Sequence, residues 1–262
     1  MTSGNSRILG RSYSWASTGL AAAALLTAAE ATAQSIADRV SGLRDGQVRM
    51  SYTARPGVCG NGRNISTHRG TDDWESWCEP GPVRVALDLR RGEVVDIDTY
   101  VGGRWRERDH VVDLGFVPAP QAARYLLSLA QMLNGDASEA AIFPATLADS
   151  AVVWPELLQL AKDVSRPRGT RKSAVFWLSQ AAGAAASEGL EEIVYDELGD
   201  REMRKSAIFA LSQLDDDGGV PILIRLVRTH PDPDIKRNAI FWLGQSGDSR
   251  AIALFEELLL KP

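Results

Sequence analysis

Three histidines and one close pair of aspartates are the residues of this chain that could perform metal or acid–base chemistry. His68, His110 and His230 stand far apart, and none has a second histidine at metal-binding spacing. Asp96 and Asp98 would share one strand face, but two carboxylates offer too few oxygens for calcium. The sequence therefore predicts no catalytic residue, no metal ligand and no cofactor. An alternative hypothesis places an enzyme or metal site near His110, Asp96 and Asp98, where a β segment meets the first helices.

A ten-residue motif that occurs three times organises the chain. Arg171–Gln180 reads RKSAVFWLSQ, and the motif returns as RKSAIFALSQ at 204–213 and as KRNAIFWLGQ at 236–245. A degenerate fourth copy lies one period upstream, around Phe143, where Pro144 replaces the tryptophan and predicts a short or kinked helix. Offsets of 33 and 32 residues are typical of stacked helical repeats.

A second helix follows each copy of the motif. Leu157, Leu190, Leu223 and Phe255 are equivalent by the period, and further apolar residues follow each of them three and four positions later. This spacing marks one face of a helix, so each period predicts a helical pair. The first helix is apolar on nearly all sides, as expected of a helix between neighbours, with Trp177 in its core. The second helix is amphipathic.

These repeats resemble HEAT-like repeats of the short kind named after phycobilin lyase, over residues of about 137–262. The resemblance implies a mainly α protein with a right-handed α-solenoid of about four helical-hairpin repeats. It also implies a surface that binds another macromolecule, without identifying a reaction.

Basic and amide side chains recur at equivalent positions of the motif. Two readings of the basic residues stay open: a structural ladder that bonds loop carboxylates such as Asp200 and Asp234, or a stripe that grips an acidic partner. The amides are expected to satisfy backbone groups between repeats. The ladder comprises Arg171, Lys172, Arg204, Lys205, Lys236 and Arg237, with Gln180, Gln213 and Gln245.

Residues 1–33 have the features of a secretory signal peptide. Arg7 and Arg11 precede an apolar run of about 15 residues, too short for the roughly 20 of a spanning helix. Ala31-Thr32-Ala33 fits a cleavage site, so the mature chain would begin at Gln34 and would contain no membrane span. The alternative is an uncleaved anchor. An alanine-rich signal favours a periplasmic or secreted bacterial protein.

Residues 34–117 predict a small β domain before the solenoid of residues 118–262. Alternating apolar residues predict antiparallel strands, with a hairpin turning at Arg90-Arg91-Gly92. Residues 35–45 look like a mobile leader, and 57–81 like an irregular loop. In an oxidising compartment Cys59 and Cys78 should form a disulfide. Trp74 and Trp77, beside Cys78, would be either core residues or binding anchors.

The chain carries a net charge of −5, which argues against nucleic acid as the partner. We expect an exported, non-catalytic scaffold that binds another protein through the polar side of the second helices, at Glu188, Glu192, Arg225 and Arg228. Leu258-Leu259-Leu260 breaks the polar pattern of the last helix. Leu260 therefore suggests a sticky end face and a second alternative, self-assembly, for example as a homodimer.

Overall fold

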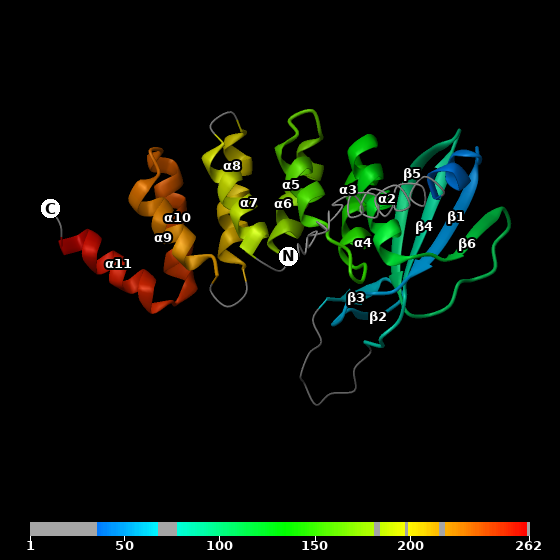
Figure 1. Ribbon diagram of the computed structural model, residues 1–262, viewed down its shortest axis with the longest axis horizontal. Helices are drawn as coiled ribbons and strands as arrows, with labels where there is room; N and C mark the ends of the chain where they lie inside the picture. The colour runs from blue at the N-terminus through cyan, green and yellow to red at the C-terminus, as the bar shows by residue number, and fades with distance from the viewer. Residues whose placement is uncertain (1–35, 68–77, 181–183, 197–198, 215–217, 261–262) are drawn as a thin grey trace, which may run out of the picture.

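The computed structural model describes residues 36–67, 78–180, 184–196, 199–214 and 218–260, in which a β region precedes a row of helices (Figure 1). The strands are β1 (Gly46–Tyr52), β2 (Cys59–Asn61), β3 (Asn64–Ser66), β4 (Val83–Arg90), β5 (Glu93–Val101) and β6 (Val111–Phe116). The expected signal peptide and the tryptophans at 74 and 77 lie outside these residues.

Four strands form one sheet in the order β5-β4-β1-β6. β5, β4 and β1 pair antiparallel, and Val48, Met50 and Tyr52 on β1 are fully buried, as their alternation predicted. β6 pairs with β1 in parallel, so the expectation of a wholly antiparallel segment is wrong at this strand. The long connection between β5 and β6 carries the chain across two strands, and it returns in the direction of β1.

The β4–β5 hairpin is confirmed, with its turn at the predicted position. Arg91 and Gly92 have φ angles of 55° and 84°, the left-handed pair that suits the twist of a two-residue hairpin loop. A register shift follows Asp88, and Val95 on the facing strand turns outward with 41% of its surface exposed. Strict alternation with Ile97 and Val101 would place Val95 inside, because a bulge leaves no trace in the apolar pattern.

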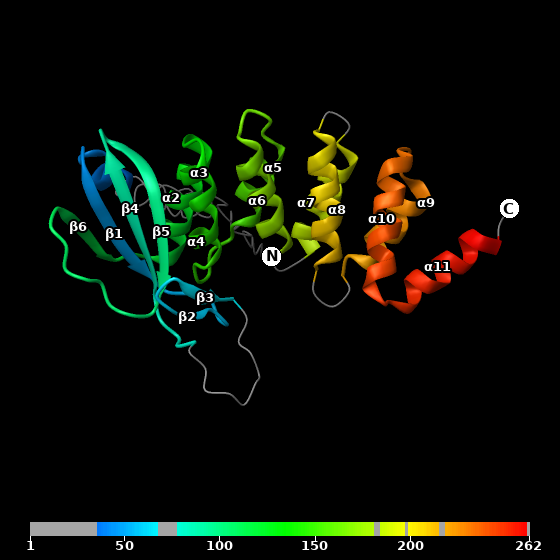
Figure 2. The same ribbon diagram turned by 180° about the vertical axis from the view of Figure 1, so that it is seen from behind.

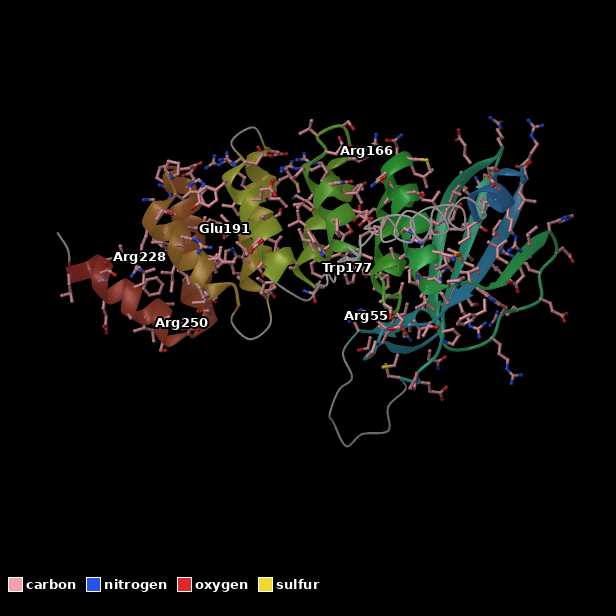
Figure 3. All side chains as sticks on the ribbon, viewed as in Figure 1. Arg55, Arg166, Trp177, Glu191, Arg228 and Arg250 are labelled. Atoms are coloured by element: carbon pink, nitrogen blue, oxygen red, sulfur yellow. A yellow bond between two sulfur atoms is a disulfide. The ribbon has the colours of Figure 1, made fainter. Side chains whose placement is uncertain are left out.

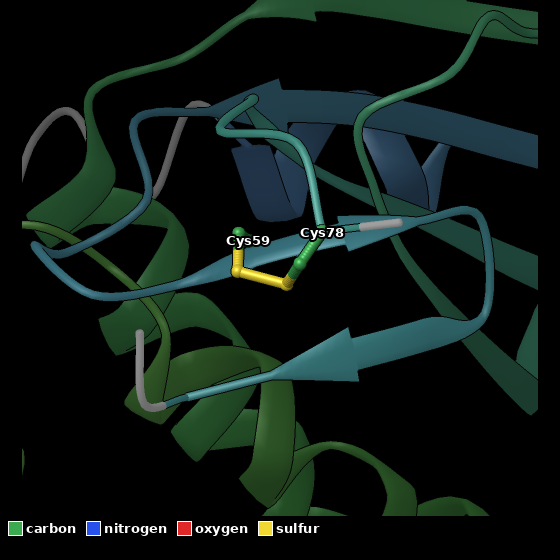
Figure 4. Close-up of a disulfide and its surroundings, with 2 residues drawn as sticks. All are labelled: Cys59 and Cys78. Carbon is green, nitrogen blue, oxygen red and sulfur yellow. A yellow bond between two sulfur atoms is a disulfide. The ribbon is translucent and has the colours of Figure 1, made fainter. Parts of the chain in front are cut away.

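The two cysteines form the predicted disulfide, with their Cα atoms 5.0 Å apart (Figure 4). The segment around them is not a plain loop, since β2 and β3 pair as a small antiparallel hairpin. Residues 36–41 are helical, and Ile36 and Val40 are buried in the core. The expected mobile leader is therefore wrong over these residues: its two apolar side chains are spaced by one helical turn and find the core.

Helices fill the rest of the described chain, and no helix in those residues is both long and apolar enough to cross a membrane. Figure 2 shows them side by side along the long axis, with the sheet at one end and α11 at the other. The helices are α2 (Ala119–Met132), α3 (Asp136–Ala140), α4 (Ile142–Thr146), α5 (Trp154–Lys162), α6 (Arg168–Ser179), α7 (Ala184–Tyr195), α8 (Arg201–Ser212), α9 (Val220–Thr229), α10 (Pro233–Ser246) and α11 (Ser249–Leu260).

These helices pair as the period predicted. The first helices of the repeats are α6, α8 and α10, each followed by a second helix, α7, α9 or α11. In the degenerate copy the first helix is broken into α3 and α4, and α5 is its second helix. Pro144 lies in α4, a helix of only five residues, which confirms the expected short helix.

One continuous apolar core joins the sheet to the helices. Tyr52 at the end of β1 is fully buried, and its hydroxyl donates a hydrogen bond of 2.6 Å to the carbonyl of Pro144. The chain after β1 keeps bonding to the loop after α4, where Arg55 N donates to Leu147 O at 2.8 Å and Asp149 N donates to Thr53 O at 3.0 Å. Burial raises the pKa of Tyr52 well above its ordinary value of 10.0.

Tyr52→Phe removes this bond, and the carbonyl of Pro144 keeps only the longer bond of 3.2 Å from Leu147 N. We expect the free energy of unfolding at neutral pH to fall by about 0.5–1.5 kcal/mol. Urea unfolding followed by circular dichroism measures the change. Tyr195→Phe is the matched control, because its hydroxyl bonds Thr229 at the surface and should change stability by less than about 0.5 kcal/mol.

The stabilities of the wild type and of Tyr52→Phe should also depend differently on alkaline pH. Because the folded-state pKa of Tyr52 lies above the unfolded value, only the unfolded chain releases this proton as the pH passes 10. The wild type should therefore lose part of its advantage over Tyr52→Phe above pH 10 and keep all of it below. An advantage that stays constant through this range would contradict the buried hydroxyl.

Candidate protein-binding surface

The first helices of the repeats carry exposed phenylalanines at equivalent positions. Phe176 on α6, Phe209 on α8 and Phe241 on α10 have 44%, 37% and 55% of their surface exposed. Since α6 contacts α8 and α8 contacts α10, the same position on each helix lies on the same face of the row. The expectation that neighbours enclose the first helices on nearly all sides is wrong on this face.

A basic residue precedes each phenylalanine by one helical turn, exposed in two copies and half-buried at Lys205. Lys172, Lys205 and Arg237 stand four positions before the aromatic residues, which puts both side chains on one helix face. The side chains of Lys205 and Arg237 are 37% and 72% exposed. We call the following six residues the basic–aromatic row: Lys172, Phe176, Lys205, Phe209, Arg237 and Phe241.

Two tryptophans pack against phenylalanine rings of the basic–aromatic row. The ring of Trp177 (Figure 3) stacks on Phe143 of α4, and the ring of Trp242 packs on Phe209 of α8, with centroids 4.9 Å apart in both cases. Each tryptophan also lies edge-on to the phenylalanine just before it in the chain, at 5.0 Å. Such contacts fix the rings in place, so the row presents ordered aromatic surface.

The second helices carry charged side chains that bind one another. Arg225 on α9 donates two hydrogen bonds to Glu191 on α7, of 2.8 and 2.6 Å, which raises the pKa of Arg225. Glu188 is exposed, and no partner for it is found in the described part of the chain. Three ion pairs join consecutive second helices: Lys162 with Glu192, Arg225 with Glu191, and Arg228 with Glu257.

Most of the residues that the sequence predicted for partner binding take part in these ion pairs between repeats. Glu192, Arg225 and Arg228 each bond a side chain of an adjacent repeat. A partner would have to replace those bonds in order to use them. The pattern of charges alone could not separate the two roles, because an ion pair and a binding site both favour exposed charge.

The side chain of Arg171 on α6 bonds the C-terminal end of the helix before it, α5. Its Nε donates to Ala161 O at 3.0 Å, at the last turn of α5, and the residue is only 6% exposed. A cation at this end also matches the helix dipole. The equivalent Arg204 lies 3.5 Å from the carboxylate of Asp232. For Lys172 and Lys236 no ion pair is found among the described residues.

The loop carboxylates bind arginines that lie one helical turn before the basic ladder residues of each first helix. Asp200 lies 3.8 Å from Arg168, and Asp234 pairs with Arg201, so each contact links one first helix to the next. Within a single helix, Lys205 bonds Glu202 at 3.2 Å, and Arg237 also pairs with Asp234. The acceptors are those that the sequence suggested, whereas the donors between repeats are mainly Arg168 and Arg201.

The repeated glutamines lie at the ends of the first helices. Gln180 is half-buried, whereas Gln213 and Gln245 are exposed. The side-chain amides of Gln180 and Gln213 donate to the hydroxyl of the serine just before each of them, at 3.3 and 3.2 Å. These bonds stay within one helix end, and none between repeats is found for them in the described chain.

The residues of the alternative metal or catalytic site do not meet. Asp96 and Asp98 lie on β5 at one edge of the sheet, whereas His110 precedes β6 at the other edge. Three strand spacings separate the edges, or about 14 Å. Asp98 accepts bonds from Arg63 at 2.6 Å and Tyr100 at 3.0 Å. Among the described residues no three His, Cys, Asp or Glu side chains gather as metal ligands would.

His230 has a structural position between two repeats. It is 3% exposed, its Nδ1 accepts a hydrogen bond of 3.0 Å from the backbone of Asp232, and its ring packs 4.9 Å from that of Tyr195. His68 lies outside the described residues.

Paired helices in a repeating row, with equivalent contacts between successive pairs, define a helical repeat protein. Residues 195–262 match the family model of HEAT repeats, which confirms the HEAT-like repeats that the motif predicted in this part of the chain. HEAT repeats generally mediate interactions between proteins. No curated protein matches the chain.

The pair between Arg225 and Glu191 should contribute measurable stability. In a double-mutant cycle with Arg225→Gln and Glu191→Gln, we expect a coupling of about 0.5–1 kcal/mol that shrinks in high salt. Urea unfolding of the four proteins measures it. The matched control cycle combines Arg225→Gln with Glu188→Gln, one helical turn before Glu191, and should give no coupling energy. Equal couplings in the two cycles would show that the bond between Arg225 and Glu191 contributes nothing specific.

Proposed function

We propose that this protein is an exported, non-catalytic scaffold that binds a partner protein along a right-handed solenoid of HEAT-like repeats. The observation that carries the proposal is the basic–aromatic row. Aromatic and basic side chains are enriched at the energetic centres of protein interfaces. Three equivalent phenylalanines, each with more than a third of its surface exposed, form a larger apolar feature than isolated surface residues do.

The spacing of the row suits an amphipathic helix as the partner segment. Neighbouring packed helices lie about 8–10 Å apart, so the three phenylalanines recur at about this distance. A helix rises about 10.5 Å over seven residues. A partner helix laid across α6, α8 and α10, with apolar residues at i, i+7 and i+14, would place one of them against each phenylalanine. Carboxylates beside that apolar stripe would meet Lys172 directly, and they would meet Lys205 and Arg237 in exchange for the pairs that these make with Glu202 and Asp234 on their own helices.

Export is supported by two features. Residues 1–33 have the charge, apolar run and small residues of a signal peptide, and the Cys59–Cys78 disulfide suits an oxidising compartment. We therefore place the mature scaffold, beginning at Gln34, in the periplasm or outside a bacterial cell.

Photo-crosslinking in the native host tests the proposal. A benzophenone side chain in place of Phe241, the most exposed of the three rings, should capture one main protein. Mass spectrometry should map the crosslink to a segment with apolar residues seven positions apart, and N-terminal sequencing of the captured scaffold should give Gln34. The same group at Glu188, on the second-helix side, should capture much less.

The affinity of the scaffold for the purified partner segment can then be measured. Phe176→Ser and Phe241→Ser should each weaken binding about tenfold or more, since buried aromatic anchors dominate interface energies. Glu188→Gln is the control and should leave affinity unchanged. Circular dichroism confirms that each variant is folded. If the phenylalanine variants bind as tightly as the control, the row is not the binding surface.

A second candidate function, self-assembly, is favoured by the exposed leucines of α11. Leu259 and Leu260 are 85% and 80% exposed. If α11 docks on a second copy, the mass of the wild type in analytical ultracentrifugation will rise with concentration, and Leu260→Lys will keep the monomer mass. Lys162→Gln, distant in the row, serves as control. A wild type that stays monomeric at every concentration would exclude this role.

A further inference from the structure

The outer face of the sheet carries a pocket of about 700 Å³, on the side away from the apolar core. Its floor comes from β1, β4 and β5, where Arg84 stands opposite Tyr100 in register, and Arg49 opposite Ala86. One wall is the segment 102–108 between β5 and β6. Another is the turn of the β2–β3 hairpin, which the disulfide ties to the chain before β4 (Figure 4).

The centre of the pocket is built from buried polar groups. Arg49 is 8% exposed and donates 2.8 Å hydrogen bonds to the side chain of Gln47 and to the carbonyl of Arg106. Its guanidinium lies 4.7 Å from the ring centroid of Trp105, and that ring packs edge-on to Tyr100 at 5.6 Å. These contacts fix the wall segment against the floor, so the pocket is ordered before any ligand binds.

Most of the positive charge around the pocket is unpaired. Six arginines and one glutamate line it, and one of the arginines, Arg63, is paired with Asp98, so a charge of +4 is left there (6 − 1 − 1), although the whole chain carries −5. Within the described residues no hydrogen bond or ion pair is found for the side chains of Arg84, Arg104, Arg106 or Arg108. The Nε of Arg84 is buried without a hydrogen-bond partner, and its guanidinium lies 5.9 Å from the ring centroid of Trp105. A buried donor left unpaired is costly, which points to a ligand that completes it.

We infer that this pocket binds a small anion carrying two or more phosphate groups. Each guanidinium presents five donors in a fork that matches phosphate oxygens. Four unpaired forks around one pocket exceed what a single carboxylate could satisfy, whereas linked phosphates offer several oxygens in different directions. The like charges of Arg84, Arg104, Arg106 and Arg108 also repel one another, and a multivalent anion removes that repulsion. This site is independent of the scaffold function.

Isothermal titration of the full mature chain with inorganic triphosphate tests the inference. We expect saturable binding with one site, weakened by salt, and a rise in the melting temperature of the protein. Arg84→Gln and Arg104→Gln should each weaken binding about tenfold. Arg90→Gln is the matched control, since Arg90 lies on the same strand but outside the pocket and is exposed. It should bind like the wild type.

Three outcomes would overturn the inference. One is the absence of saturable binding by the folded wild type. Another is equal weakening in Arg84→Gln, Arg104→Gln and Arg90→Gln, which would reveal only a general charge effect. The third is tighter binding of citrate or of a single-stranded oligonucleotide than of triphosphate, which would reject a phosphate-bearing small ligand. Arg104 lies in an exposed connection, so its variant keeps the test valid if Arg84→Gln fails to fold.

Discussion

A helical repeat cannot bury its apolar face alone, so the first member of a row needs a cover. Here α2 and the sheet supply that cover, and one buried contact fixes them. Tyr52 joins the end of β1 to Pro144 in α4, where the first helix of the degenerate repeat is broken. The backbone bonds that follow, from Arg55 to Leu147 and from Asp149 to Thr53, hold the sheet in one orientation. Each later repeat then stacks on the one before it.

Stacking by repetition copies exposed positions as faithfully as buried ones. Ala174, Ala207 and Ala239 are buried wherever the period places them, and two positions later the phenylalanines are exposed in all three copies. The side chains between helices are therefore ordered by packing, and their outer neighbours inherit that order. For this reason a row of aromatic rings can be rigid without being enclosed, which lowers the entropy that binding must overcome.

The sequence predicted the helical pairs, the hairpin and the disulfide, because period and turn chemistry are local signals. It could not predict the direction of β6, since alternation is the same in parallel and antiparallel strands. It predicted first helices enclosed by neighbours on nearly all sides, because apolarity marks both a core and an interface. A basic residue four positions before each ring, as at Lys205 and Phe209, was the signal that could have separated the two. Arginine at every second position from Arg104 to Arg108 was the corresponding signal for the pocket.

The disulfide connects stability with the pocket. The hairpin of β2 and β3 is short, and such a hairpin is marginal without support. The bond between Cys59 and Cys78 holds its base, and Arg63 at its turn then pairs with Asp98 and lies 5.5 Å from the ring centroid of Tyr100. Asp98 is thus bound to Arg63, and among the described residues no hydrogen bond joins it to Arg84 on the neighbouring strand. The guanidinium of Arg84 lies 5.9 Å from the ring centroid of Trp105, and no anionic partner for it is found in the described chain, which supports the inferred anion site.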